Sequence, residues 1–220
     1  MAVVVFCLFA GCRQIKSEMH SVRLGRMRAM LLAIRQYCET FGQSPHSDVF
    51  NSQNEPIVSW RYRVAQFLDA PPTKFKLLKD TKWDDVEYAK WSGYRQNCIC
   101  VKDSTSTSVV AVVGGDVAFT KGLCNSDVTA LILIELSTSN IHWMAPKDFN
   151  INELEASSAV SLGRFLESPE TDIVLGFGDG KVCLVRGDIQ KDIIIRLARL
   201  SSEDRDQRES IIDSYRISSD

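Results

Sequence analysis

The sequence has almost no net charge and no broad basic field. Its 220 residues carry 26 lysine and arginine side chains against 28 aspartate and glutamate side chains, which gives a net charge of −2. Proteins that hold nucleic acid through its phosphates present a basic surface, so nucleic-acid binding is not expected. The 45% hydrophobic content is enough for one substantial core, and no shift in composition indicates a second one.

Signatures of catalysis are also missing. The chain has three histidines, and neither a Gly-x-Ser-x-Gly nor a His-Glu-x-x-His pattern occurs. One enzymatic alternative has Cys124 as a nucleophile and His142 or His46 as its base, because a thiol needs a nearby imidazole to become a useful thiolate. We predict no catalytic residue, and we keep an enzyme of unrecognised type as an alternative.

Patterns that hold metals, cofactors or phosphates are equally scarce. The seven cysteines match no zinc pattern, since one residue separates Cys98 from Cys100 and no second pair follows. The glycines at 114–115 and around Asp179 precede segments that look extended, whereas a phosphate loop needs a helix there. Calcium needs about six to eight oxygen ligands, and no Asp-x-Asp-x-Asp-Gly ladder is present. The sequence thus predicts no metal, no cofactor and no small-molecule substrate.

The chain starts with a short apolar run, MAVVVFCLFAGC. The run is much shorter than the roughly 20 residues of a membrane-spanning helix and has the length of an export signal. Its end, Leu8-Phe9-Ala10-Gly11-Cys12, resembles a bacterial lipobox, in which small residues precede a cysteine that becomes lipidated, although no Lys or Arg precedes the run. We predict a signal segment over 1–12 and a lipid on Cys12. The alternative is a buried strand formed by VVVFCLF.

Apolar residues recur at helical spacing in three stretches. Over 22–41 they predict an amphipathic helix that Gly42 and Pro45 end. Pro56 can open a second helix that carries Trp60, and Asp188 can cap a last helix, which runs to Leu200. The segment 201–220 is highly charged and poor in aromatics, so we expect a disordered tail there.

Between these helices, short runs of branched apolar residues alternate with turns. The runs CICVK, SVVAVVG, ALILIEL, DIVLGF and KVCLV predict the strands of an antiparallel sheet. Gly178-Asp179-Gly180 joins the last two runs and is suited to positive φ, which predicts a hairpin. The order of the elements predicts an α+β fold.

The segment Asn140–Phe149, NIHWMAPKDF, gathers reactive-looking side chains after the apolar run ALILIEL. A buried tryptophan needs an acceptor for its indole proton, and Pro146 forces Ala145 toward extended geometry. We interpret this segment as a structural corner built on Trp143 and Pro146. In this interpretation Lys147 and Asp148 pair at the surface, where an ion pair contributes little.

Seven short motifs follow one another over residues 25–200. They are Phe41-Gly42-Gln43-Ser44-Pro45, Ser59-Trp60-Arg61, Trp83-Asp84, Ala111-Val112-Val113-Gly114, Leu133-Ile134-Glu135, Trp143-Met144-Ala145-Pro146-Lys147-Asp148 and Phe177-Gly178-Asp179-Gly180. In this order they resemble a large planctomycete family of unknown function that has a prepilin-like N-terminus and a pseudopilin-type domain. The resemblance implies a pseudopilin-like fold over 15–200, in which a long N-terminal helix packs on an antiparallel β-sheet. It implies no known catalysis.

The chain departs from the family pattern at three places. The polar stretch RQIKSEMHS follows Cys12 in place of a hydrophobic stem, Pro169 replaces a frequent histidine, and Thr171 and Asp172 replace frequent glycines. A lipid on Cys12 would replace the missing stem as a membrane anchor.

The sequence therefore predicts a non-enzymatic, exported, lipid-anchored pilin-like domain in the cell envelope, periplasmic or on the outer surface. Its role would be structural or protein-binding, its partners being the membrane and envelope proteins that the sequence does not identify. The residues expected to define its fold are Trp60, Trp143, Pro146, Asp148, Gly178, Asp179 and Gly180. The rival hypothesis is a pseudopilin of a type II secretion or type IV pilus-like assembly.

Overall fold

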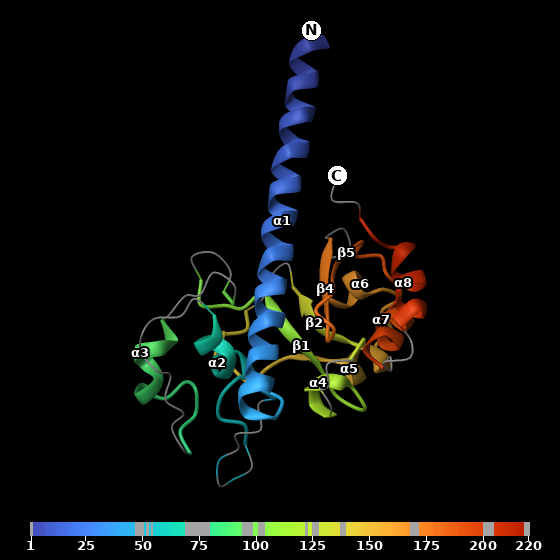
Figure 1. Ribbon diagram of the computed structural model, residues 1–220. Coiled ribbons are helices and arrows are strands. Elements are labelled where there is room, and N and C mark those ends of the chain that lie inside the picture. The colour runs from blue at the N-terminus through green and yellow to red at the C-terminus, as the bar shows by residue number, and fades with distance from the viewer. Residues whose placement is uncertain are drawn as a thin grey trace.

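A long helix crosses one face of a sheet, and short helices cover the other face (Figure 1). The computed structural model describes residues 2–46, 51, 53, 55–68, 80–93, 99–100, 104–121, 123–124, 128–136, 140–167, 172–199 and 205–217. Of residues 2–16, 92, 121 and 205 it describes the backbone alone. Over these ranges the fold is α+β, with an N-terminal helix and a mostly antiparallel sheet, as the sequence predicts.

The sheet has five strands in the order β3-β1-β2-β4-β5. Its strands are β1 (Val109–Val113), β2 (Leu131–Glu135), β3 (Phe149–Asn150), β4 (Ile173–Phe177) and β5 (Val182–Val185). Pairing is antiparallel except between β1 and the short edge strand β3, where Val112 faces Phe149 in a parallel register. Four of the five predicted strands are confirmed. Of CICVK only Ile99 and Cys100 are described, and Cys100 forms an isolated bridge with Thr107.

Both faces of the sheet are buried, and alternate residues of β1, β4 and β5 belong to different cores. In β1, Val109 and Ala111 pack in the core beneath the long helix, whereas Val110 and Val112 pack against the short helices on the opposite face. A strand that is buried on both faces has a continuous run of apolar residues, because neither its odd-numbered nor its even-numbered side chains face solvent. This explains why VVAVV and LILIE contain so few polar residues.

The long helix, α1 (Ala2–Phe41), buries one stripe against β4 and β5. The stripe consists of Met27, Met30, Leu31, Ala33, Ile34, Tyr37 and Cys38. Gly42, with φ of 68°, ends the helix and donates its amide to the Cys38 carbonyl at 2.8 Å. The helix predicted over 22–41 is confirmed, and its backbone also includes 2–21. The alternative that VVVFCLF forms a strand is therefore wrong.

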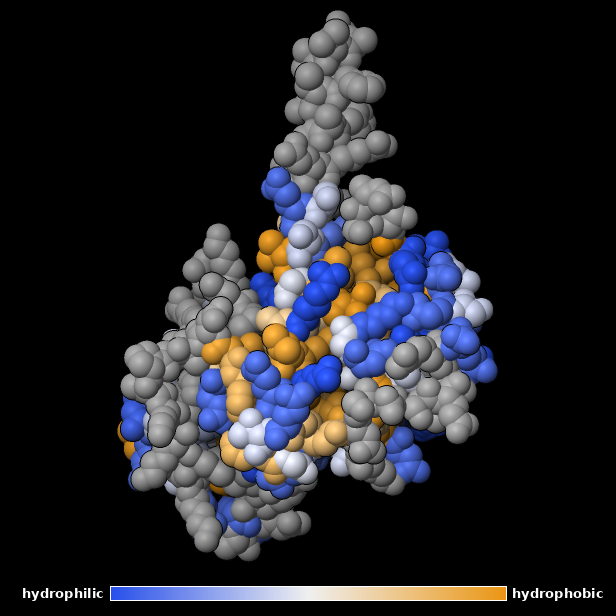
Figure 2. Space-filling view, in the orientation of Figure 1, coloured by the Kyte–Doolittle hydropathy of each residue, from blue (hydrophilic) through white to orange (hydrophobic). Residues whose placement is uncertain are grey.

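The N-terminal turns of α1 project beyond the body of the molecule (Figure 1). Within the described ranges, no helix contains a stretch long and apolar enough to cross a membrane. Where α1 crosses the body, apolar residues flank it on both sides (Figure 2). Large apolar side chains of α1 itself are also exposed, namely Met19, Val22, Leu32 and Phe41.

The remaining helices are short, and side-chain caps start several of them. They are α2 (Trp60–Val64), η1 (Ala65–Phe67), η2 (Val86–Tyr88), α3 (Ala89–Ser92), α4 (Ala118–Lys121), α5 (Ile151–Ala156), α6 (Leu162–Phe165), α7 (Lys191–Ala198) and α8 (Arg205–Asp213). The side chains of Ser59, Asn150 and Ser161 accept backbone amides in the first turns of α2, α5 and α6.

Three local expectations about helix starts are wrong. The second helix begins after Ser59, whose hydroxyl caps it, and not at Pro56. The N-cap of α7 is Gln190, whereas Asp188 accepts a hydrogen bond from the Arg186 side chain at 3.2 Å. The residues after Asp116 enter the four-residue helix α4 and are not extended, although so short a helix offers little dipole to an anion.

The expected disordered tail is wrong over 205–217, because α8 packs on the sheet. Ile212 and Arg208 are both buried, and the Arg208 guanidinium donates to the Asp179 carboxylate at 2.7 Å and to the Thr129 carbonyl at 3.4 Å. Tyr215 and Ile217 continue the contact, since the Tyr215 carbonyl accepts the Arg186 amide and the Ile217 amide donates to the Leu184 carbonyl. A helix with few apolar residues is thus held by charge contacts. Residues 201–204 and 218–220 lie outside the described part.

Glu209 is the centre of the charge cluster on α8. Burial by itself raises the pKa of its carboxyl, but hydrogen bonds from Lys181, Arg208 and Arg216 outweigh burial and lower the pKa from 4.5 to about 2. A carboxyl whose pKa is lower in the folded chain stabilises the fold fully above its unfolded pKa. That contribution is lost as the pH falls from 4.5 toward 2.

We expect Glu209→Gln to lower the free energy of unfolding at pH 7 by about 1–2 kcal/mol, less than the full linkage value because Glu209 is partly exposed. It should also flatten the decline in stability between pH 4.5 and pH 2. Urea unfolding across this pH range measures both effects. Glu39→Gln removes a carboxylate from an exposed pair with Arg35 and should leave the acid profile of the parent. If the stability of Glu209→Gln fell as steeply between pH 4.5 and pH 2 as that of the parent, the Glu209 carboxyl would not be the group responsible.

Candidate functional site

Arg61 organises the segment Asn140–Phe149. Its guanidinium has no exposed surface, and it reaches the segment because Ser59 caps α2 and orients the first helical turn. Arg61 Nε donates to the Trp143 carbonyl at 3.1 Å, and Nη2 donates to the carbonyls of Ala145 at 3.0 Å and Lys147 at 2.9 Å. One side chain therefore fixes the backbone of the segment at three points.

Asp148 provides the negative charge that faces Arg61. Its Oδ1 accepts Arg61 Nη1 at 2.7 Å, Trp60 Nε1 at 2.9 Å and the Ala111 amide at 2.9 Å. The Asp148 side chain is only 6% exposed, whereas Lys147 points to solvent. The expected surface pair between Lys147 and Asp148 is therefore wrong, because Asp148 joins α2 to β1 inside the molecule.

The aromatic side chains of the segment pack into the core. Trp143 is buried and stacks on Tyr62, with ring centroids 6.0 Å apart. Pro146 follows a tight turn in which the Ala145 amide donates to the His142 carbonyl at 2.9 Å. The Met144 carbonyl accepts the Ser59 amide at 2.9 Å, which ties the turn to the start of α2. The polar groups of the segment thus bond to the side chains of Trp60 and Arg61 and to backbone groups, as a structural corner requires.

The Gly178–Gly180 turn joins β4 to β5 in the predicted hairpin. Gly180 has φ of 87°, a conformation that favours glycine, and the Asp179 carboxylate accepts the Lys181 amide at 3.1 Å. At Gly178 a β-carbon would lie 2.7 Å from the Val128 carbonyl oxygen. The turn therefore packs backbone against backbone, while Asp179 reaches Arg208 of α8.

A second buried carboxylate, Glu135, fixes α1 to the end of β2. It accepts Arg23 Nε at 2.7 Å and Arg26 Nη1 at 3.5 Å. His20 Nε2 lies 3.2 Å from the Asp172 carboxylate in the same region. This contact was not predicted from the sequence, although a glutamate at the end of an apolar strand and arginines on a predicted helix are the signal that could have indicated it.

The candidate thiol and the candidate bases lie in different surroundings. Cys124 meets Cys38 in a groove beside α1, and within the described chain no histidine lines that groove. His142 accepts the Met144 amide at 3.2 Å and stacks on Trp83, with centroids 4.8 Å apart. His46 lies beside Phe119, with centroids 6.1 Å apart. The structure therefore does not bring Cys124 and either proposed base together.

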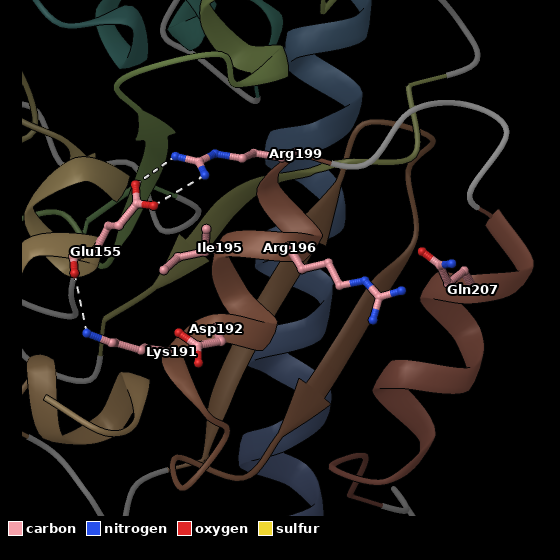
Figure 3. Close-up of a pocket in the computed structure, with 7 residues that line it drawn as sticks. All are labelled: Glu155, Lys191, Asp192, Ile195, Arg196, Arg199 and Gln207. Atoms are coloured by element: carbon pink, nitrogen blue, oxygen red, sulfur yellow. Dashed lines mark hydrogen bonds and ion pairs between the residues drawn. The ribbon is translucent and has the colours of Figure 1, made fainter.

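A hollow of about 540 Å³ lies between α5, α7 and α8 (Figure 3). The Glu155 carboxylate accepts Arg199 Nη2 at 2.8 Å, and the Glu155 carbonyl accepts Lys191 Nζ at 3.3 Å. Arg196 extends from α7 toward α8, which carries Gln207 (Figure 3). Both partners of the Glu155–Arg199 pair are well exposed, so this hollow is a solvated ion-pair surface.

Over the described ranges, no three His, Cys, Asp or Glu side chains are grouped so that they could hold a metal ion. No protein-family model, curated protein or solved structure matches the chain.

We expect Asp148→Asn to lower the free energy of unfolding by about 3–5 kcal/mol, because it leaves the Arg61 charge buried without a counter-charge. The matched control is Asp188→Asn, whose partner Arg186 is exposed, and its effect should stay within about 0.5 kcal/mol. Urea unfolding of the two variants and the parent measures the difference. Equal effects of the two substitutions would show that the buried charge pair does not hold the corner.

Gly178→Ala should lower the free energy of unfolding by about 1–3 kcal/mol, because its methyl group would overlap the Val128 backbone. Gly25→Ala, in an exposed part of α1 with nothing within 4 Å of the added carbon, should instead raise stability by about 0.5–1 kcal/mol. Thermal unfolding of both variants tests the opposite signs. A stabilising Gly178→Ala would mean that the turn does not press against Val128.

Proposed function

We propose that the chain is a non-enzymatic, exported pilin-like domain that is anchored by lipid on Cys12 and makes structural or protein-binding contacts in the cell envelope. Three things support this proposal: the lipobox-like Leu8–Cys12, the ordered motifs that resemble the planctomycete family, and an α+β body with one long N-terminal helix. The pseudopilin-like identity of the fold is part of the proposal.

The direction of α1 is the observation that carries the proposal. Among the described side chains of α1, His20 is the first that is buried, and the helix continues away from the body toward the N-terminus (Figure 1). At 1.5 Å per residue, Cys12 lies about 12 Å along the helix axis from His20. A lipid on Cys12 would thus hold the body at a short distance from a membrane surface. One acyl chain binds a bilayer only marginally, so the anchor needs more than one chain.

The non-enzymatic part of the proposal is supported by how the charged side chains are used. Arg61, Glu135 and Arg208 are buried, and each joins separate elements of the fold. Catalytic groups instead gather around a cavity that substrate can enter. Among the described residues, the buried charges thus contribute to the architecture.

The second candidate is a pseudopilin of a type II secretion or type IV pilus-like assembly. The continuity of α1 from Ala2 to Phe41 favours it, because a pseudopilin would join such an assembly by its N-terminal helix. The polar stretch after Cys12 speaks against it, since charged side chains inside a helical bundle or a bilayer are costly.

The intact mass of the native protein from a membrane fraction tests the proposal. We expect a chain that begins at Cys12 and carries added lipid mass, and we expect Cys12→Ala to abolish both the lipid and the membrane association. Cys7→Ala is the matched control, because it changes a thiol in the same apolar run and should keep the lipid.

Two outcomes would overturn the lipid anchor. A soluble, unmodified chain that retains Met1 would refute export. A chain that is processed without lipid and self-associates through its N-terminal helix would establish the pseudopilin alternative.

A further inference from the structure

Two cysteines meet in a groove beside α1. Cys38 lies in the last turns of α1, and Cys124 lies between α4 and β2. Both line a groove of about 510 Å³ whose walls also include Leu31, Leu123 and the Gly178–Gly180 turn. The groove therefore brings together a helix and a connecting segment that are far apart in the sequence.

The two thiols lie side by side in the groove, but they differ in exposure. Cys38 is buried and Cys124 is exposed, and a hydrogen bond joins the two thiols. Burial, followed by that hydrogen bond, raises the pKa of Cys38 to about 12. Cys38 is thus a protonated, protected thiol, whereas Cys124 is open to reagents that enter the groove.

We propose that Cys38 and Cys124 are a redox pair that reacts with disulfide compounds, such as glutathione disulfide or a protein disulfide, and closes into an intramolecular disulfide. A disulfide requires two cysteine side chains that lie next to each other and face each other, and Cys38 and Cys124 line the same groove. The other cysteines whose side chains are described have different surroundings, since Cys183 lies in β5 and Cys100 bridges Thr107.

The exchange proceeds in two balanced steps. The Cys124 thiolate attacks one sulfur of the oxidant, which forms a mixed disulfide and releases one oxidant thiolate. Cys38 then gives up its proton and attacks the Cys124 sulfur, which forms the Cys38–Cys124 bond and releases the second thiolate. The two protein thiols are oxidised, and the oxidant disulfide is reduced to two thiols that take up the two protons.

The disulfide would fix the C-terminal end of α1 covalently to the segment before β2. In the reduced chain, that end of α1 is held by packing of its apolar stripe, while Glu135 holds Arg23 and Arg26 in the middle of the helix. Because the bond closes a long loop, it restricts the unfolded chain and stabilises the fold. The proposal is independent of the lipid anchor, since both cysteines lie on the body.

The test uses the full chain, equilibrated in mixtures of reduced and oxidised glutathione and then alkylated. Peptide mass mapping should find a Cys38–Cys124 cross-link that disappears on reduction. Cys124→Ser changes an exposed residue and should abolish the cross-link, whereas the matched control Cys100→Ser should keep it. Oxidation should also raise the midpoint of urea unfolding in the parent and leave it unchanged in Cys124→Ser.

Three results would overturn the proposal. They are a stable glutathione adduct on Cys124 with Cys38 still alkylatable, a cross-link from either cysteine to another position, and full alkylation of both thiols in the most oxidising mixture. Each result is measured at Cys38 and Cys124, which lie on the body of the protein, so failure of lipidation at Cys12 would leave the outcome unaffected. The two proposals therefore fail separately.

Discussion

The part of the molecule beside β1 depends on one buried ion pair, Arg61 with Asp148. Removing both charges from water costs several kcal/mol each, so the pair persists only where further hydrogen bonds offset that cost. Here the guanidinium meets four backbone carbonyls, and the carboxylate oxygen meets an indole and a backbone amide. Three of these carbonyls, those of Trp143, Ala145 and Lys147, reach Arg61 because the chain turns sharply just before Pro146. The charge pair and the shape of the corner therefore require each other.

Two kinds of contact set the position of α1. Apolar packing holds the helix against the sheet, and ion pairs fix its position along its axis. Apolar packing against β4 and β5 provides most of the attraction, but an apolar stripe of Met and Leu would tolerate a shift along the sheet. The contacts of Arg23 and Arg26 with Glu135 have directional geometry and are part-buried. They fix where along its axis α1 sits, and hence how far its N-terminal turns extend from the body.

Much of the sheet could be predicted because its signals are local. Branched apolar runs predict β1, β2, β4 and β5, and Gly178-Asp179-Gly180 predicts the hairpin. The two-residue strand β3 has no such pattern, since its pairing with β1 depends on the corner that precedes it. The helix α8 was missed because its own sequence is polar. Its stability comes from Asp179 and Lys181, which are 29 and 28 residues away from their partners.

The wrong prediction that Lys147 pairs with Asp148 has the same cause, a contact between residues that are distant in the sequence. Lys147 is its neighbour in the sequence, but adjacent residues in extended chain point to opposite sides, so the lysine reaches solvent while the carboxylate turns inward. Arg61 is 87 residues away, and nothing in the local pattern indicates that a helix N-terminus will deliver it there. Charge pairs that join distant segments become visible only when the backbone has been placed.

Buried charges hold the scaffold of this protein together, whereas the exposed Cys124 of the Cys38–Cys124 groove is open to chemical reagents. Among the described residues, Arg61, Glu135 and Arg208 are satisfied by partners from other elements, so their charges are not available to a ligand. Cys124 differs, because it lies in a groove, is exposed and contacts a second thiol. That groove adjoins α1, the element that leaves the body. Chemistry at this position would therefore act on the attachment of the long helix and not on the core.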